Sequence, residues 1–146
     1  MRNPTLFLRI CYVSIFITAA CVILLFEGGM LTPPHIADDA SRYVLNIVGV
    51  ALTLALLPLG LKVFTLSLPR RQGAASVGGY VRWAVVRLTL LSVPLYFNIL
   101  AFYLLDRYAT CGWMALMAAV MFMFVWPSDG RMRYERATAY PQDEKQ

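Results

Sequence analysis

Four long apolar runs joined by short polar segments dominate this 146-residue chain. A helix of about 20 apolar residues crosses the roughly 30 Å hydrocarbon core of a bilayer. The chain is therefore predicted to be all-α, an integral membrane bundle of four antiparallel transmembrane helices in residues 1–127, with a tail at 128–146. Short connections are expected to place consecutive helices side by side. The expected helices span residues 6–26, 43–66, 82–105 and 110–126.

The composition agrees with lipid as the solvent. Hydrophobic residues make up 60% of the chain and charged residues 14%, against about 45–50% and about 25% in soluble domains. The net charge of +5 raises nucleic acid as a partner. However, the basic residues stand at the ends of apolar runs, where lipid headgroups lie. We therefore expect membrane lipids as partners, anionic on the cytoplasmic side, and no nucleic acid.

Lysine and arginine are distributed very unequally between the two sides of the predicted bundle. Eleven fall on the side of the termini and two, Arg42 and Arg107, on the other. Positive residues mark cytoplasmic segments, so both termini are expected in the cytoplasm, in a bacterial cytoplasmic (inner) membrane. The residues of the basic side are Arg2, Arg9, Lys62, Arg70, Arg71, Arg82, Arg87, Arg131, Arg133, Arg136 and Lys145.

Three basic residues, Arg9, Lys62 and Arg87, lie inside the apolar runs. Charges within a span are costly and are candidates for function. Their long stems allow the charged groups to reach the phosphate depth individually. Alternatively, they converge between helices and hold an anionic lipid headgroup or another anion. The spacing leaves both interpretations open.

The second predicted helix carries a polar and small-residue stripe. Asn46, Gly49, Thr53 and Gly60 share one face, and small residues allow two helix backbones to approach closely. Pro58 lies in the same helix and frees the carbonyl of Leu54. Gly49, Thr53 and Gly60 are expected to pack helices together, and Asn46 and Pro58 are candidates for lining a polar cavity.

On the third predicted helix, Arg87, Pro94 and Asn98 share a face. Pro94 frees the carbonyl of Leu90, and freed carbonyls beside polar side chains line the cavities of some transporters. Asn98 and Pro94 complete the candidate cavity. Ordinary helix packing with tolerated proline kinks is the competing interpretation.

The fourth predicted helix has a small-residue face made by Gly112, Ala115 and Ala119. Such a face suits packing against another helix of the same chain or of a partner. Pro127 is expected to end this helix, and the tail beyond it is expected to form a short juxtamembrane helix.

No motif or cluster in the chain predicts catalysis, a metal or a cofactor. His35 stands with Asp38 and Asp39 in a proline-rich segment, which fits a solvated loop with an aspartate capping the next helix better than a metal site. Cys21 and Cys111 are expected on the same side and either pair or pack as small apolar residues.

The sequence therefore favours a non-enzymatic accessory or scaffold subunit that packs against itself or a larger membrane complex. The alternative is a small oligomeric transporter, channel or lipid-handling protein. It would use the polar, proline-broken region between the second and third helices.

Overall fold

The computed structural model describes residues 3–34, 36–63 and 76–139, and these residues form five helices and no strand. The helices are α1 (Pro4–Glu27), α2 (Asp39–Leu61), α4 (Val77–Leu104), α5 (Ala109–Met123) and α6 (Asp129–Ala139). The all-α class is thus confirmed. α1, α2 and α4 are long and apolar enough to cross a membrane, whereas α5 has 15 residues and is shorter.

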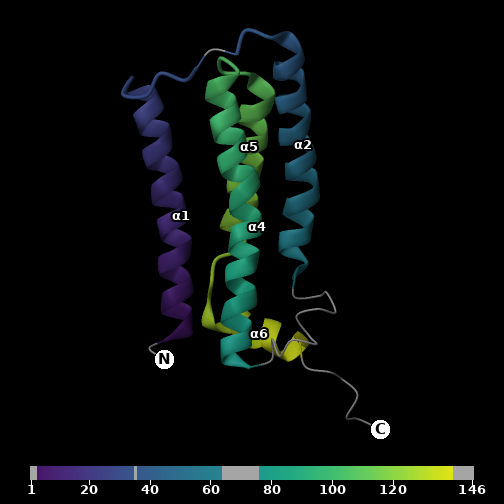
Figure 1. The fold of residues 1–146 in the computed structure, drawn as a ribbon. Coiled ribbons are helices and arrows are strands. Elements are labelled where there is room, and N and C mark those ends of the chain that lie inside the picture. Colours follow the sequence, from purple (N-terminus) through teal and green to yellow (C-terminus); the bar gives the residue numbers. More distant parts are fainter. Residues whose placement is uncertain (1–2, 35, 64–75, 140–146) are drawn as a thin grey trace.

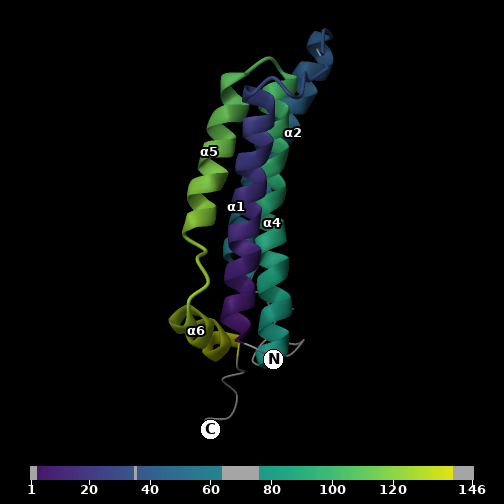
Figure 2. The ribbon, with the colours of Figure 1, turned by 90° about the vertical axis from the view of Figure 1, so that its left-hand side faces the viewer.

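Helix α4 is the centre of the molecule and packs against α1, α2 and α5. Figure 1 shows α1 and α2 on opposite sides of α4, and the side view in Figure 2 places α5 beside the pair formed by α1 and α4. The expectation that consecutive helices lie side by side is therefore wrong for α1 and α2. The segment of residues 28–38 that joins them is long enough to cross over the end of the bundle.

The molecule has two distinct ends. The first, here called the α6 end, holds α6 together with the N-terminal ends of α1 and α4. The second, the Glu27 end, holds the C-terminal ends of α1 and α4 and the N-terminal ends of α2 and α5. α1 and α4 run toward the Glu27 end, and α2 and α5 run back toward the α6 end. These four helices therefore alternate in direction along the chain.

The helices begin where capping residues allow it. Pro4 occupies the first turn of α1, where its missing N–H costs nothing. The Asp38 carboxylate accepts from the Ser41 N–H at 3.2 Å, so α2 starts four residues before the expected position 43. The Ser76 hydroxyl accepts from the Gly79 N–H at 3.1 Å and starts α4 before the expected 82. Hydrogen bonds from Ser41, led by that of its hydroxyl, hold the pKa of Asp38 below its usual value.

Helix α5 ends at Met123, three residues before the expected 126. Pro127 has no N–H, and its ring would clash with the Met123 carbonyl in a continuing helix. A residue before proline also avoids helical geometry, which applies to Trp126. The segment Phe124–Ser128 therefore leaves the helix and leads to α6.

Several residues used in the sequence argument lie outside the described part of the chain. They are Arg2, His35, Arg70, Arg71 and Lys145. The expected helix 43–66 also extends beyond the described residues at 64–66, and α2 ends at Leu61.

Candidate functional site

A buried ion pair joins α4 to α6 at the α6 end. The Arg87 side chain is 2% exposed, and its Nη1 donates to Oε1 of Glu135, whose side chain is 10% exposed. Tyr80 donates its hydroxyl to Oε2 of the same carboxylate at 2.9 Å. Arg131 donates from Nε to Oε1 at 2.8 Å. One carboxylate therefore serves three donors.

Helix geometry explains why these groups meet. Tyr80 and Arg87 are seven residues apart and so lie two turns apart on one face of α4. Arg131 and Glu135 are four residues apart and are neighbours on α6. A charge removed from water is tolerated when it is paired and hydrogen-bonded. The cluster, Tyr80, Arg87, Arg131 and Glu135, is built to hold α6 against α4.

Carbonyl groups at the C-terminal end of α5 and in the segment after it accept hydrogen bonds from side chains of other helices. The Tyr12 hydroxyl of α1 donates to the Phe122 carbonyl at 3.1 Å. Nη1 of Arg131 donates to the Phe124 carbonyl, and Nε of Arg9 donates to the Pro127 carbonyl at 3.1 Å. A helix end that is partly buried needs such partners. These bonds fix the C-terminal end of α5 between α1 and α6.

The three cations predicted as anion ligands, Arg9, Lys62 and Arg87, have different environments. Arg87 is buried against the carboxylate of α6, and the half-buried Arg9 contacts the segment after α5. Lys62 is exposed just beyond α2. The structure thus gives Arg9 and Arg87 separate partners within the chain.

Hydrogen bonds link the polar residues of α2 and α4, but the buried Oδ1 of Asn98 accepts none among the described residues. Nδ2 of Asn98, a residue that is 0% exposed, donates to Thr53 Oγ1 at 2.8 Å and to the Pro94 carbonyl at 2.7 Å. The Thr53 hydroxyl donates in turn to the Gly49 carbonyl at 2.7 Å. A Cβ on Gly49 would lie 2.7 Å from Asn98 Oδ1, so glycine is required for this close approach.

Of the other residues predicted to pack helices or to line a cavity, some contact a neighbouring helix and one is exposed. Gly60 is buried against Leu91 of α4, and Pro94 is buried within α4. Pro58 is exposed. Asn46 accepts from the Cys111 thiol at 3.7 Å and joins α2 to α5. Cys111 is buried with a free thiol, and the free thiol of Cys21 is exposed on α1.

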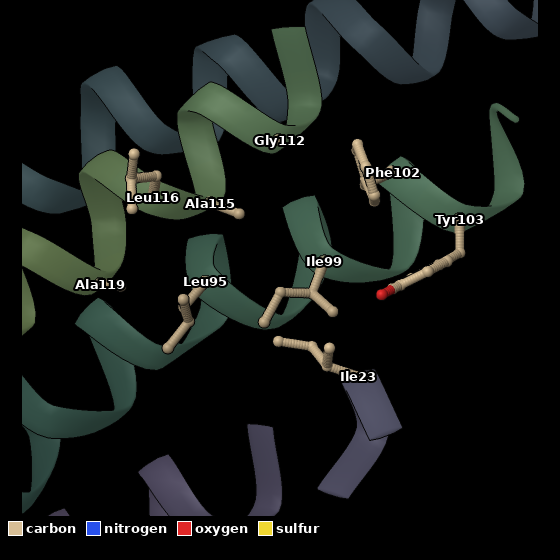
Figure 3. Close-up of a pocket in the computed structure, with 9 residues that line it drawn as sticks. All are labelled: Ile23, Leu95, Ile99, Phe102, Tyr103, Gly112, Ala115, Leu116 and Ala119. Carbon is tan, nitrogen blue, oxygen red and sulfur yellow. The ribbon is translucent and has the colours of Figure 1, made fainter. Parts of the chain in front are cut away.

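The small-residue face of α5 lines an apolar cavity at the Glu27 end. The cavity has a volume of about 290 Å³ and lies between α1, α4 and α5, as Figure 3 shows. Gly112, Ala115 and Ala119 form its α5 side, and Ile23 of α1 faces them across it. Asn98 is not among its lining residues.

An exposed ion pair stands beside this cavity. Arg107 Nη2 lies 2.9 Å from Glu27 Oε2, with side chains 64% and 45% exposed. The Tyr103 hydroxyl donates to Glu27 Oε1 at 3.0 Å, and the Tyr103 ring lines the cavity. Asp106 and Arg107 have φ values of 56° and 60°, so the turn that presents Arg107 lies in the left-handed region.

Sequence reasoning missed Glu135 and Tyr80. The available signal was that Glu135 is an acid inside the basic stretch 131–136, four residues after Arg131. The pattern on α4 identified Arg87 as a costly charge, but the spacing within one helix does not identify its partner 48 residues away. Only the docking of α6 brings them together.

No group of three histidine, cysteine, aspartate or glutamate side chains is placed to hold a metal ion in residues 3–34, 36–63 and 76–139. No protein-family model, curated protein or solved structure matches this chain.

Proposed function

We propose that this chain is a small non-enzymatic membrane protein, an accessory or scaffold subunit that packs against itself or against a larger membrane complex. In this proposal it crosses a bacterial inner membrane four times, with both termini in the cytoplasm. α1, α2 and α4 make three crossings. α5 and the apolar segment Phe124–Trp126 make the fourth.

The charge distribution and the alternating helix directions support this topology. α5 alone covers about 22 Å at 1.5 Å per residue, less than the roughly 30 Å of a hydrocarbon core. The non-helical segment continues it, and the capped carbonyls of Phe122, Phe124 and Pro127 meet the rule that backbone groups within a bilayer need partners. Reporter fusions at Met1 and Gln146 are expected to respond from one compartment. Responses from opposite compartments would contradict the topology.

One observation carries the scaffold proposal: polar side chains of the long helices form hydrogen bonds inside the chain, while apolar helix faces stay exposed. Asn98 bonds to Thr53, and Arg87 bonds to Glu135, in contacts between helices. The apolar faces of α1 and α2, by contrast, remain open: 17% and 22% of their most apolar windows are buried, against 44% in α4. Such a chain offers helix surface rather than a reactive group.

Site-specific photo-crosslinking in native membranes tests the proposal. A crosslinker replacing Ile17 on α1 or Leu54 on α2, which are 58% and 63% exposed, is expected to capture a second copy or one recurring protein of fixed mass. The same crosslinker at the fully buried Leu91 is the control and should give no intermolecular product. A monomer after mild solubilisation, with lipid as the sole adduct at both exposed positions, would refute the scaffold role.

The transporter alternative has less support. It needs a polar path near Asn98, whereas the Asn98 amide donates to Thr53 and Pro94 in a contact tight enough to require Gly49. Reconstituted vesicles with the Arg87→Ala and Asn98→Ala variants separate the two functions. Solute flux in the unaltered protein that Asn98→Ala abolishes while the variant stays folded would favour transport, whereas loss of flux in Arg87→Ala alone would reflect the broken pair with Glu135.

A further inference from the structure

The apolar cavity at the Glu27 end lies between α1 and α4, which are long enough to cross a membrane, and the shorter α5. Ile23, Ile99 and Ala115 come from α1, α4 and α5 and face one another across it. An apolar cavity does not hold ordered water, because water needs polar partners. In a bilayer the surrounding solvent is hydrocarbon, so hydrocarbon is what such a cavity takes up.

The lining of the cavity suits an acyl chain. Gly112, Ala115 and Ala119 leave space beside α5, and Leu95 and Ile99 of α4 border that space with methyl and methylene groups. An acyl chain is a single row of methylene groups, so part of one chain can occupy an apolar cavity of about 290 Å³.

The polar groups at the rim identify the headgroup. Tyr103 links cavity and rim, because its ring lines the cavity and its hydroxyl donates to Glu27. Figure 3 shows this hydroxyl directed toward α1. Glu27 and Arg107 then present one negative and one positive group side by side, both largely open to the surroundings. Arginine binds phosphate through paired N–H groups, and a carboxylate accepts from an ammonium group.

We propose that the cavity and its rim bind a zwitterionic phospholipid, with one acyl chain between α1 and α5, the phosphate at Arg107 and the ammonium group at Glu27. A purely anionic headgroup would meet Arg107 but would be repelled by Glu27. A lipid without a charged headgroup would leave the ion pair unused. The inference rests on the membrane topology of the proposed function, but not on its scaffold role.

Native mass spectrometry of the delipidated full-length protein tests the site. The lipids added are phosphatidylethanolamine and phosphatidylglycerol with identical acyl chains. Phosphatidylethanolamine is expected to bind at least fivefold more tightly. Glu27→Gln should remove this preference, and Arg107→Gln should weaken binding of both lipids. Equal binding of the two lipids to the unaltered protein would overturn the headgroup assignment.

A cavity-filling variant tests the acyl-chain site. Ala115→Phe is expected to weaken phosphatidylethanolamine binding at least tenfold, because the ring occupies the space of the chain. Ala55→Phe, on the exposed face of α2, is the matched control and should bind as the unaltered protein does. An equal response of the two variants would show that the lipid binds non-specifically around the helices.

A measurement on the unaltered protein covers the case in which Ala115→Phe fails to fold. Phosphatidylethanolamine carrying a photoreactive group on its acyl chain is expected to label residues around Ile23 and Ala115 more than the exposed face of α2. Labelling spread evenly over α1, α2 and α5 would overturn the proposal.

Discussion

The two ends of this molecule use ion pairs in opposite ways. At the α6 end Arg87 is buried with Glu135, and two further donors surround the carboxylate. At the Glu27 end Arg107 and Glu27 form a pair that stays exposed beside an open cavity. The buried pair joins α4 to α6, whereas the exposed pair leaves its charged groups accessible to a ligand. The depth of burial, rather than the type of contact, separates a structural pair from one that can meet a ligand.

The largest expected effect comes from breaking the buried pair. Glu135→Gln removes the charge that balances Arg87, and leaving a buried charge without its counter-ion costs about 3–5 kcal/mol. The free energy of unfolding, measured by denaturant titration in detergent micelles, should fall by that amount. Hydrogen exchange of residues 129–137 should rise in parallel.

The triple variant Arg87→Met, Glu135→Leu and Tyr80→Phe sharpens this prediction, because it also removes the buried hydroxyl that donates to Glu135. Replacing both charged partners by apolar side chains of similar volume is often neutral, so most of the stability should return. If Glu135→Gln unfolded like the unaltered protein, the cluster would not be what holds α6.

The second prediction compares two glycines, one in the tight contact of α2 with α4 and one beside the cavity. A Cβ at Gly60 would lie 2.8 Å from Leu91 Cδ2 and 2.9 Å from its Cγ, and Leu91 is fully buried. Overpacking of this kind costs about 1–3 kcal/mol. Gly60→Ala is therefore expected to lower the unfolding free energy by that amount.

Gly112→Ala should be close to neutral. Its Cβ would meet the Phe102 ring at 3.1 Å, but this ring borders the cavity and has space to move. Gly78→Ala, with nothing within 4 Å, is the control and should not destabilise. Equal losses at Gly60 and Gly112 would show that the Glu27 end is as rigid as the contact between α2 and α4.

The third prediction concerns the exposed pair. Glu27→Gln should change the unfolding free energy by about 0–1 kcal/mol, because water and salt screen the interaction. Repeating the measurement in about 1 M salt, where the screening length is about 3 Å, should remove the difference. A loss comparable to that of Glu135→Gln would contradict the contrast between the ends.

The smallest effect is expected from pH at the start of α2. Asp38 has a pKa below its usual value because Ser41 donates to its carboxylate. A lowered pKa in the folded state means that the carboxylate stabilises the protein above the usual aspartate range. This contribution is lost as the pH falls through the folded value. NMR titration should show Ser41→Ala raising the pKa of Asp38, and an unchanged value would contradict the assigned cap.

The pattern of apolar runs was enough to predict the helices, because length and composition alone decide whether a helix can cross a lipid core. The helices capped by Asp38 and Ser76 start several residues before the predicted positions, because an apolar run does not show how far the helix extends into the polar residues before it. The neighbours of each helix were less predictable. α1 packs on α4, and its Tyr12 and Arg9 side chains also donate to the carbonyls of Phe122 in α5 and Pro127 in the segment after it.

The candidate site shows the same limit. Periodicity placed Arg87 and Asn98 on one face of a helix, but it did not reveal that their partners are Glu135 and Thr53. The cavity beside Ala115 depends on how far α1 stands from α5, a distance that no sequence spacing encodes.

The contacts between α1 and the region from the end of α5 to the start of α6 have a consequence for biogenesis. Thr5, Arg9 and Tyr12 meet residues 110–124 positions later in the chain. A ribosome releases the early helix long before those residues exist. These contacts of α1 can therefore form only at a late step of assembly, after residues 122–129 have been synthesised.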